Sequence, residues 1–547
     1  MLDHAVIDSL FPADLPEPEH WERRYPAREL PEGAEVTRFG PSPTGFVHIG
    51  GVYVAMIDKD VAARSSGSYV VRVEDTDQSR EVGGALEQFA RAFDYFRIQP
   101  TEGEGPGGDY GPYHQSARER IYLSYVRDLL RQGRAYLCFA TRDELADITA
   151  RQQASKVPPG YYGRWAIWRD ADEQRVRAAL AEGLPHVVRF RAPDDATGAR
   201  VRFTDEIRGE LEHEANRNDV VILKSSDQPV RLPTYHFAHA VDDHLMRTTL
   251  VIRGEEWISS VPLHLQLFAA LGFEVPRYAH IAPLMKQISG GKRKLSKRKD
   301  PEASVDFYIG AGYPADAVLY YLRGLANGRL AELPLATALD EPIRLAECGV
   351  AGPLVDLVKL EDISADHIAT LTGEQIVAAL RPWAAAHDPE IVTVLDANPD
   401  LALAALAVER VGVDNPRKDL RKWSDFRPAY GFFFTELFEP VTDPADERFG
   451  GLDPQLVRSF LTDFADGYQP LADGGEWFDQ IRQLATKYNF APSPKEHKKN
   501  PGTYPGSIRE AATMVRVALT GSTRSPDLHA VATTLGTDEV RRRLRAV

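Results

Sequence analysis

Residues 36–51 read VTRFGPSPTGFVHIGG. Val36–Phe39 is typical of a short strand, and a helix is expected from Val52, where apolar residues recur on one face. Between them, Pro41 and Pro43 stiffen a loop whose glycines let the backbone approach a ligand. Backbone N–H groups at a helix start favour an anion. This stretch therefore predicts an anion-binding loop between a strand and a helix.

The next segment repeats the pattern. Tyr69–Val73 (YVVRV) is typical of a buried strand, ends in Glu-Asp-Thr-Asp at residues 74–77, and precedes a helix expected over residues 84–96. Strand, helix, strand, helix predicts an α/β fold with a doubly wound parallel sheet. Ligands of such sheets lie at the carboxyl ends of the strands. The first loop and residues 74–77 should therefore lie close together.

Further along, residues 133–215 interrupt the sheet pattern and indicate an inserted domain. Strands are expected at residues 235–241 and 250–253, and a helix at residues 262–271. From about residue 316 the chain should be mostly helical. Thr372 and Gln375 form a capping-box pattern, and helices are expected over residues 400–411 and 453–464. Residues 1–35 should be partly ordered at best.

Length and composition limit the classes of protein to which the chain can belong. A chain of 547 residues implies three to five domains, and no apolar run is long enough to span a membrane. Residues 1–35 resemble neither a secretory signal nor a transit peptide. The two cysteines, Cys138 and Cys348, favour a reducing cytoplasm. The net charge of −15 argues against nonspecific binding to polyanions, although a local basic face suffices for docking.

A second loop, KRKLSKRKD at residues 292–300, is rich in lysine. Well-placed cations can stabilise negative charge that builds on a departing phosphate group. Either loop alone is most simply a turn or a solvated basic segment. Together they predict that the fold brings the two loops around ATP.

At these residues the chain resembles the glutamyl-tRNA synthetases, a family of class I aminoacyl-tRNA synthetases. The family pattern R-F-A-P-S-P-T-G, then H-[IV]-G-G, corresponds to residues 38–45 and 48–51, with Gly40 in place of alanine. Other similar segments follow in the family order: RVEDTD (72–77), GPYHQS (111–116), PTYHFA (233–238), VDDHLM (241–246), VIRGEEW (251–257), KLSKR (294–298) and RVALTG (516–521). The resemblance is strong over about 36–330, weaker beyond, and absent over 1–35.

The resemblance implies a Rossmann-type class I catalytic domain (36–120 and 229–285) after an N-terminal extension (1–35). It also implies an inserted acceptor-stem-binding domain (121–228), a KMSKS-like loop with a stem-contact domain (286–365), and a mostly helical anticodon-binding region (366–547). The implied activity is glutamate–tRNA ligation. Glutamate is activated with ATP to glutamyl-adenylate and then transferred to the terminal adenosine of tRNA(Glu), and the first step is expected to require bound tRNA.

Site roles follow from the same resemblance. Catalysis is assigned to His48, Lys294 and Lys297, and ATP binding to Thr44, His48, Gly50, Gly51, Glu256, Leu295 and Lys297. Glutamate binding is assigned to Arg38, Ser42, Glu74, Tyr235, His239 and Arg253. Arg38 and Arg253 would hold the carboxylates, because guanidinium groups bind them through paired hydrogen bonds, and Glu74 would accept from the ammonium group. His239 departs from the asparagine common in the family. Asp242-Asp243-His244 is expected to make structural hydrogen bonds rather than a metal site.

For tRNA, the candidate phosphate contacts are Arg417, Lys418, Arg421, Lys422, Lys495, Lys498 and Lys499, each of which could equally be a solvated surface charge. Some family members bind zinc in the inserted domain. Of the three cysteines in that motif only Cys138 is present here, so no zinc is expected. Mg²⁺ is expected with ATP, held by phosphates and water. A monomer is the family expectation.

Three alternatives stay open. Glutaminyl-tRNA synthetases share the fold but favour P-E-P-N-G where residues 41–45 are PSPTG. A short relative that glutamylates a tRNA base lacks the long helical region. An inactive or regulatory tRNA-binding paralogue would be expected to lose His48, Lys294 or Lys297, which are present. The sequence leaves open whether tRNA(Gln) is also charged.

Overall fold

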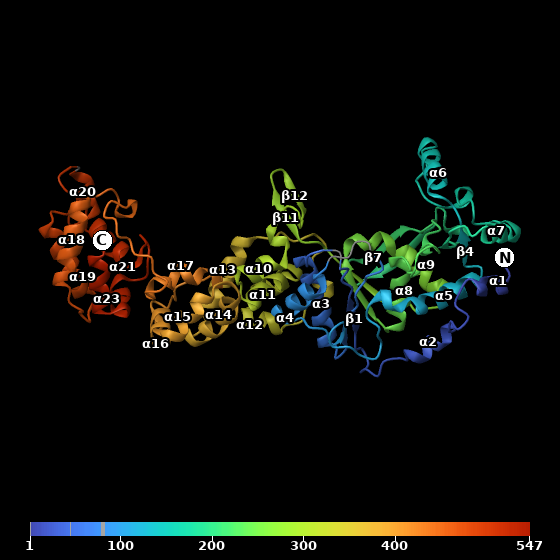
Figure 1. The fold of residues 1–547 in the computed structure, drawn as a ribbon, viewed down its shortest axis with the longest axis horizontal. Coiled ribbons are helices and arrows are strands. Elements are labelled where there is room, and N and C mark those ends of the chain that lie inside the picture. Colours follow the sequence, from blue (N-terminus) through green and yellow to red (C-terminus); the bar gives the residue numbers. More distant parts are fainter. Residues whose placement is uncertain (1, 44, 78–82, 501) are drawn as a thin grey trace. The chain divides into compact units, whose positions relative to one another are not determined.

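The computed structural model describes residues 2–43, 45–77, 83–500 and 502–547. The chain forms two compact units (Figure 1). The first comprises Met1–Phe307 and Leu319–Val355, and the second Tyr308–Val318 and Asp356–Val547. The chain passes between them within α10 (Val305–Ala311), within α11 (Ala315–Ala326) and again between Val355 and Asp356.

The first unit is built on a parallel sheet. β1 (Val36–Phe39) pairs with β2 (Ser68–Val71), and β2 with β3 (Glu102–Gly103). β9 (Leu250–Gly254) pairs with β10 (Arg277–Ile281), which pairs with β6 (Arg200–Asp205). Thr249 N donates to Val36 O at 3.0 Å, so β9 lies beside β1. The order β3-β2-β1-β9-β10-β6 reverses between β1 and β9, and it confirms the predicted doubly wound sheet.

Three crossover helices connect these strands: α3 (Ile49–Arg64), α4 (Ala85–Tyr95) and α9 (Val261–Leu271). All three were expected from sequence periodicity. The N-cap of α3 is His48, whose Nδ1 accepts from Gly50 N at 2.9 Å. β2 is shorter than expected, because Val73 leaves the ladder and its N–H donates to Tyr113 O at 2.8 Å.

The strand expected over residues 235–241 is wrong. These residues lie in a helix, α8 (Tyr235–Leu245). Its buried apolar residues, Phe237, Ala238, Val241 and Leu245, follow helical spacing. Periodicity over a window as short as residues 235–241 does not separate a buried strand from a buried helix.

The inserted segment follows α5 (Glu119–Arg131). It contains an antiparallel sheet of β4 (Ala135–Cys138), β5 (Val187–Phe190) and β8 (Val221–Leu223), together with α6 (Arg142–Ala154) and α7 (Glu173–Ala181). Its hairpin of β6 and β7 (Gly209–Glu214) extends the main sheet. Figure 1 shows α6 projecting from this segment. After β10 come the hairpin β11 (Met285–Ile288) and β12 (Gly291–Lys294) and then α12 (Leu335–Asp340).

The N-terminal segment is ordered over its described residues, so the expectation of partial order is wrong. It contains α1 (His4–Ser9) and α2 (Pro18–Arg24). Ile7 and Tyr25 are buried, and Trp21 Nε1 donates to Ser124 Oγ at 2.9 Å. Acidic residues of the segment pair with arginines of α5, as in Glu17–Arg131 at 2.9 Å. Several of the acidic side chains that suggested disorder are instead paired with arginines elsewhere in the first unit.

The second unit is mostly helical, as expected. Its helices are α13 (Leu357–Ala369), α14 (Gly373–His387), α15 (Pro389–Ala397), α16 (Pro399–Ala407), α17 (Phe426–Tyr430), α18 (Pro454–Gly467), α19 (Gly474–Lys487), α20 (Pro494–Lys499), α21 (Ile508–Thr520), α22 (Leu528–Leu535) and α23 (Thr537–Arg545). The capping box of Thr372 and Gln375 is present, and Asp453 caps α18. α16 ends before the predicted residue 411. Among the described residues no helix is long and apolar enough to span a membrane.

The first prediction concerns Glu22, which joins the N-terminal segment to α8. Its carboxylate contacts His244 Nε2 at 2.8 Å and Arg247 Nη2 at 2.9 Å. Burial alone would raise its pKa, but hydrogen bonds from His244, Arg247 and Tyr125 lower the pKa to about 2, from 4.5. Because the folded pKa is depressed, the stabilisation is present above pH 4.5 and is lost as the pH falls towards 2.

We therefore expect Glu22→Gln to lower the free energy of unfolding at pH 7 by about 0.5–1 kcal/mol, as for partly exposed ion pairs. The deficit should shrink at pH 3, measured by urea denaturation. Glu19→Gln, on the exposed side of the same helix, is the control and should have no effect. A deficit that does not change between pH 7 and pH 3 would contradict this account.

The second prediction concerns Asp58, which is fully buried on α3. Neither of its carboxylate oxygens has a hydrogen-bond partner among the described residues. Burial raises the pKa of Asp58 well above its usual value. A raised folded pKa means that the stability is greatest below the unfolded pKa and is lost as the pH rises through the folded pKa.

Asp58→Asn removes this titration and should raise the free energy of unfolding at pH 8 by about 1–3 kcal/mol. The gain should be smaller at pH 4, again by urea denaturation. Asp60→Asn is the matched control on the same helix. Its carboxylate accepts from Arg323 Nη1 at 2.9 Å and from Ile343 N at 2.8 Å, so this change should destabilise. Destabilisation by both variants would show that Asp58 has a partner.

Candidate active site

A cavity of about 410 Å³ opens where β1 and β9 end, at the point where the sheet order reverses. Ligands of doubly wound sheets bind at this point. The cavity is lined by Arg38, Phe39, Gly40, Ser42, Val54, Glu74, Thr76, Asp77, Tyr235, Ile252, Arg253, Gly254 and Trp257. The structure thus brings together Arg38, Ser42, Glu74, Tyr235 and Arg253, all assigned to glutamate from the sequence. The sixth predicted residue, His239, lies outside the lining.

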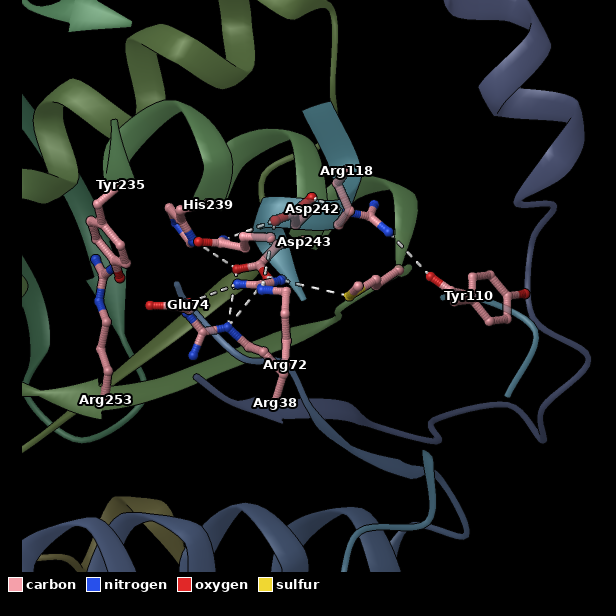
Figure 2. Close-up of polar contacts among 12 residues, drawn as sticks. Arg38, Arg72, Glu74, Tyr110, Arg118, Tyr235, His239, Asp242, Asp243 and Arg253 are labelled. Carbon is pink, nitrogen blue, oxygen red and sulfur yellow. Dashed lines mark hydrogen bonds and ion pairs between the residues drawn. The ribbon is translucent and has the colours of Figure 1, made fainter. Parts of the chain in front are cut away.

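One carboxylate, that of Asp243, contacts two arginines next to this cavity (Figure 2). Asp243 Oδ1 accepts from Arg72 Nη1 at 2.5 Å, and Asp243 Oδ2 accepts from Arg38 Nε at 3.1 Å. Burial would raise the pKa of Asp243, but Arg38 and Arg72 hold it well below its usual value. Among the described residues Arg38 donates through its Nε alone, so both of its NH₂ groups remain for a ligand at the cavity.

The neighbouring Asp242 has its own hydrogen-bond donors. It accepts from Arg118 Nε at 2.6 Å, Gln115 Nε2 at 2.9 Å and the Tyr122 hydroxyl at 2.7 Å. The two aspartates share one ion-pair partner, because Arg72 Nε also lies 3.7 Å from Asp242 Oδ2. The structural role predicted for this pair is therefore observed. Sequence reasoning missed that Asp243 also supports the site.

His239 stands behind Tyr235, with their rings stacked at 6.0 Å. Its Nδ1 lies 2.6 Å from Asp243 Oδ2 and its Nε2 lies 3.2 Å from the Tyr278 hydroxyl. Tyr235, His239 and Asp243 are spaced four residues apart on one face of α8. Burial lowers the pKa of His239 to about 3, so the imidazole is neutral at pH 7. Direct contact of His239 with glutamate stays a prediction. The contact that the structure shows is between His239 and Asp243.

Glu74 follows β2, where its N–H donates to Pro41 O at 2.8 Å. Its Oε1 accepts from Arg72 Nη2 at 3.0 Å, and its side chain is 12% exposed. Burial raises the pKa of Glu74, although Arg72 and Arg38 oppose this. An ammonium group entering the cavity would supply the cation that this carboxylate lacks on its open side.

Gly40 makes that position possible. A Cβ at residue 40 would lie 2.4 Å from Glu74 Oε1, closer than van der Waals contact allows. The glycine that replaces the common alanine of the family pattern is therefore matched to the position of Glu74 in this chain.

The two predicted loops lie together. Lys297 Nζ, from the second loop, donates to Phe46 O of the first, and Val305 N donates to Val47 O at 3.1 Å. Burial and then Lys297 lower the pKa of His48, so its ring is neutral and can donate through Nε2. Gly50 and Gly51 form the first turn of α3. Thr44, also assigned to ATP, lies outside the described residues.

The second loop is held by Asp300. Arg293 donates to both oxygens of Asp300 at 2.6 and 2.7 Å, and Ser296 N donates at 2.9 Å. Leu295 is buried, and its N–H donates to Leu284 O at 2.9 Å. Lys294 Nζ lies 3.0 Å from Glu256 Oε1. Sequence reasoning did not single out Asp300, although its place at the end of a lysine-rich run is a usable signal.

Other supporting residues were also missed. Gln88 Oε1 accepts from Val47 N at 2.9 Å, and Gln88 Nε2 donates to Asp306 Oδ2. His264 and His280 contact Arg253. Their positions in the sequence carried no signal, because each belongs to an otherwise apolar helix or strand.

The predicted tRNA contacts lie in the second unit. In one run, Arg417 pairs with Asp419 at 2.6 Å, Lys418 with Asp366 at 2.6 Å, and Arg421 and Lys422 with Glu361 at 2.9 and 3.1 Å. By contrast, Lys495, Lys498 and Lys499 are exposed on α20, where no carboxylate of the described chain pairs with them. A role of either group in tRNA binding stays a prediction. The lysines of α20 are the more available for a phosphate, because the residues of the first run are already paired with carboxylates.

The segment that carries zinc ligands in some family members is packed differently here. Cys138 is buried, and its Sγ donates to the Tyr161 hydroxyl at 3.4 Å. The guanidinium of Arg189 lies 4.0 Å from the centre of the Tyr161 ring. Within the described ranges no cluster of three or more His, Cys, Asp or Glu side chains could hold a metal. The absence of zinc stays a prediction.

The site yields a third prediction. Gly40→Ala should displace the Glu74 carboxylate and raise the glutamate KM about tenfold, the equivalent of one charge-assisted hydrogen bond. The ATP KM should not change. Kinetics of pyrophosphate exchange with varied glutamate and varied ATP would separate the two. Gly310→Ala serves as control, because a Cβ there meets no atom within 4 Å. An unchanged glutamate KM would show that Glu74 does not bind the substrate from this position.

The comparisons agree with this geometry. Residues 35–335 match the model of the tRNA synthetases class I (E and Q) catalytic domain, and residues 507–547 match an anticodon binding domain. The chain is 40% identical to the glutamate–tRNA ligase of Sorangium cellulosum, covering 96% of this chain and 97% of the relative. It is also 40% identical to that of Clostridium beijerinckii, covering 96% of each.

Among solved structures, a glutamate tRNA ligase from Elizabethkingia meningosepticum, in complex with its amino acid, superposes with a TM-score of 0.73. It is 26% identical, and the match covers 94% of this chain and 98% of that structure. The catalytic-domain model spans more than half of the chain, and the relatives match it over nearly its full length. The chain therefore belongs to the class I tRNA synthetases of the E and Q type.

Proposed function

We propose that this protein is a glutamate–tRNA ligase. It activates L-glutamate with ATP to glutamyl-adenylate and pyrophosphate, and then transfers the glutamyl group to the 3′-terminal adenosine of tRNA(Glu). The observation that carries the proposal is the set of charges on one cavity. Arg38 and Arg253 present cations, Glu74 presents a carboxylate, and the two ATP loops meet next to them.

The substrate suits this arrangement. Glutamate at neutral pH carries two carboxylates and one ammonium group, which matches two guanidinium groups and one carboxylate. The free NH₂ groups of Arg38 and the side of Arg253 facing the cavity would bind the carboxylates, and Glu74 would accept from the ammonium. Holding the substrate in this way positions the α-carboxylate for attack on ATP.

ATP would lie along the first loop and the start of α3. Gly50 and Gly51 would let the phosphates approach the start of α3 closely, and the neutral His48 would donate to a phosphate oxygen through Nε2. Lys294 and Lys297 would exchange their present partners, Glu256 and Phe46 O, for the departing pyrophosphate. Their cationic charge would then be most effective in the transition state. Mg²⁺ would be held by the phosphates and by water.

Two observations favour this function over its alternatives. No described carboxylate lies within 4.0 Å of Arg253, which suits a carboxylate ligand better than the amide of glutamine. Glu74 lines the cavity, and His48 and Lys297 lie on the two loops that contact each other, an arrangement that an inactive tRNA-binding paralogue would not need to retain. A monomer in a reducing cytoplasm completes the proposal; both cysteines are unpaired thiols.

The test is ATP–pyrophosphate exchange with glutamate and purified tRNA(Glu), which should occur with the wild-type enzyme. Lys297→Ala should lower kcat by about 10²–10³, as for loss of one transition-state donor, with little change in the glutamate KM. Lys292→Ala, exposed on the same hairpin, is the matched control. No wild-type exchange would favour the tRNA-binding paralogue, and faster exchange with glutamine would favour a glutaminyl-tRNA synthetase. Charging of purified tRNA(Gln) measures whether one or both tRNAs are substrates.

A further inference from the structure

Arg253 is buried but is paired differently from the other buried arginines of the site. Arg38 and Arg72 contact Asp243, and Arg118 contacts Asp242. Arg253 instead contacts two histidines, with Nε 3.1 Å from His280 Nε2 and Nη2 3.2 Å from His264 Nδ1. Its third contact is Nη1 to the Tyr235 hydroxyl at 3.5 Å. In the described chain no carboxylate lies within 4.0 Å of this guanidinium.

These contacts set the tautomers of both histidines. A guanidinium group only donates, so His280 Nε2 and His264 Nδ1 must accept. His280 then carries its proton on Nδ1 and donates it to Asp205 Oδ2 at 2.6 Å. His264 carries its proton on Nε2 and donates it to His236 Nδ1 at 2.9 Å. Both rings are therefore neutral acceptors held by a second hydrogen bond (Figure 2 shows Arg253 beside Tyr235).

The surroundings keep these rings neutral. Burial lowers the pKa of His264 well below its usual value and that of His236 to about 4. Burial also lowers the pKa of His280, although its hydrogen bond with Asp205 opposes the change. Asp205 is itself buried and accepts the backbone N–H groups of His280, Ile207 and Arg208, each at 3.0 Å. It stands at the end of β6, so the inserted segment supports a residue of the amino-acid cavity.

We propose that His264 and His280 are positioning residues that aim the Arg253 guanidinium at the cavity while leaving its charge unneutralised, so that the cavity selects a carboxylate over a carboxamide. This inference rests on the proposed function. A buried cation without a counter-ion is costly. A glutamate carboxylate would supply the missing charge with paired hydrogen bonds. The amide of glutamine would supply one acceptor, no charge, and an NH₂ group that cannot accept from the guanidinium.

The arrangement also restricts rotation of the guanidinium. Its carbon lies 5.0 Å from the centre of the Tyr278 ring and 5.9 Å from that of Trp257. Rotation of the guanidinium would break the hydrogen bonds from Nε and Nη2 to the two histidines. A neutral acceptor fixes the orientation of the Arg253 guanidinium without removing its charge. An aspartate in the same place would fix the orientation and cancel the charge.

The first experiment tests positioning. His280→Leu removes the acceptor for Arg253 Nε and should raise the glutamate KM about tenfold or more, since hydrogen bonds to charged groups contribute on that scale. The ATP KM and kcat at saturating glutamate should stay near wild type in pyrophosphate exchange. His280→Gln, whose Oε1 can accept in place of Nε2, should restore the KM to within about threefold. His186→Leu, a buried histidine away from Arg253 that contacts Ser226, is the control and should not alter it.

The second experiment tests the charge. His264→Asp and His264→Asn have nearly the same size, and only the first places a carboxylate beside Arg253 Nη2. We expect the ratio of kcat/KM for glutamate to that for glutamine to fall at least about tenfold in His264→Asp relative to His264→Asn. An equal ratio in both variants would overturn the selectivity argument. A rise in ATP KM equal to that of glutamate in His280→Leu, or no rescue by His280→Gln, would overturn the positioning argument.

These outcomes are separable from failure of the proposed function. Wild-type exchange with glutamate tests the function by itself, and only the differences between variants test the histidines. If His280→Leu does not fold, as judged by circular dichroism, the paired His264 variants and His280→Gln still decide the inference. Calorimetric titration of glutamate and glutamine onto the same variants gives the selectivity without turnover.

Discussion

The active-site unit depends on the buried negative charge of Asp243. It joins Arg38 of β1, Arg72 after β2 and His239 of α8, three elements that are distant in the sequence. Both guanidinium side chains are nearly inaccessible to water. Loss of this carboxylate would leave Arg38 without its ion-pair partner and Arg72 with only Glu74 and Asp242. The same contact orients Arg38 towards the cavity. Stability and substrate recognition therefore share one interaction, and the parallel sheet brings its partners together.

The remaining charges divide into two groups. Arg72 and Arg118 are neutralised by the protein and hold the structure together. Arg253 has neutral partners, and Glu74 borders open space in the cavity. A zwitterionic amino acid with an acidic side chain would place a carboxylate next to Arg253 and an ammonium group next to Glu74. In the proposed function, selectivity follows from the charge of Arg253 that no described carboxylate neutralises, because the cost of a buried unpaired charge falls on any ligand that does not match it.

Two supports hold this centre in place. Asp300 and Gln88 hold the lysine-rich loop and the Pro/Gly loop against each other. On the other side of the unit, the N-terminal segment contacts α5 and the end of α8 through Glu17 and Glu22. That segment lies outside the catalytic-domain match, yet it contacts the helix that carries Asp243. Its acidic composition, which suggested disorder, is complementary to arginines that only the folded unit presents.

The sequence by itself determined the parallel sheet, the crossover helices and the helical second unit, because periodicity and helix caps are local signals. The order of its motifs also indicated five residues that line the cavity: Arg38, Ser42, Glu74, Tyr235 and Arg253. It did not determine that residues 235–245 form a helix, since an apolar run so short fits a strand equally well. Nor did it indicate which aspartate serves which arginine, or that Arg253 has histidines for partners. Those facts depend on contacts between residues far apart in the chain, and only the tertiary packing decides them.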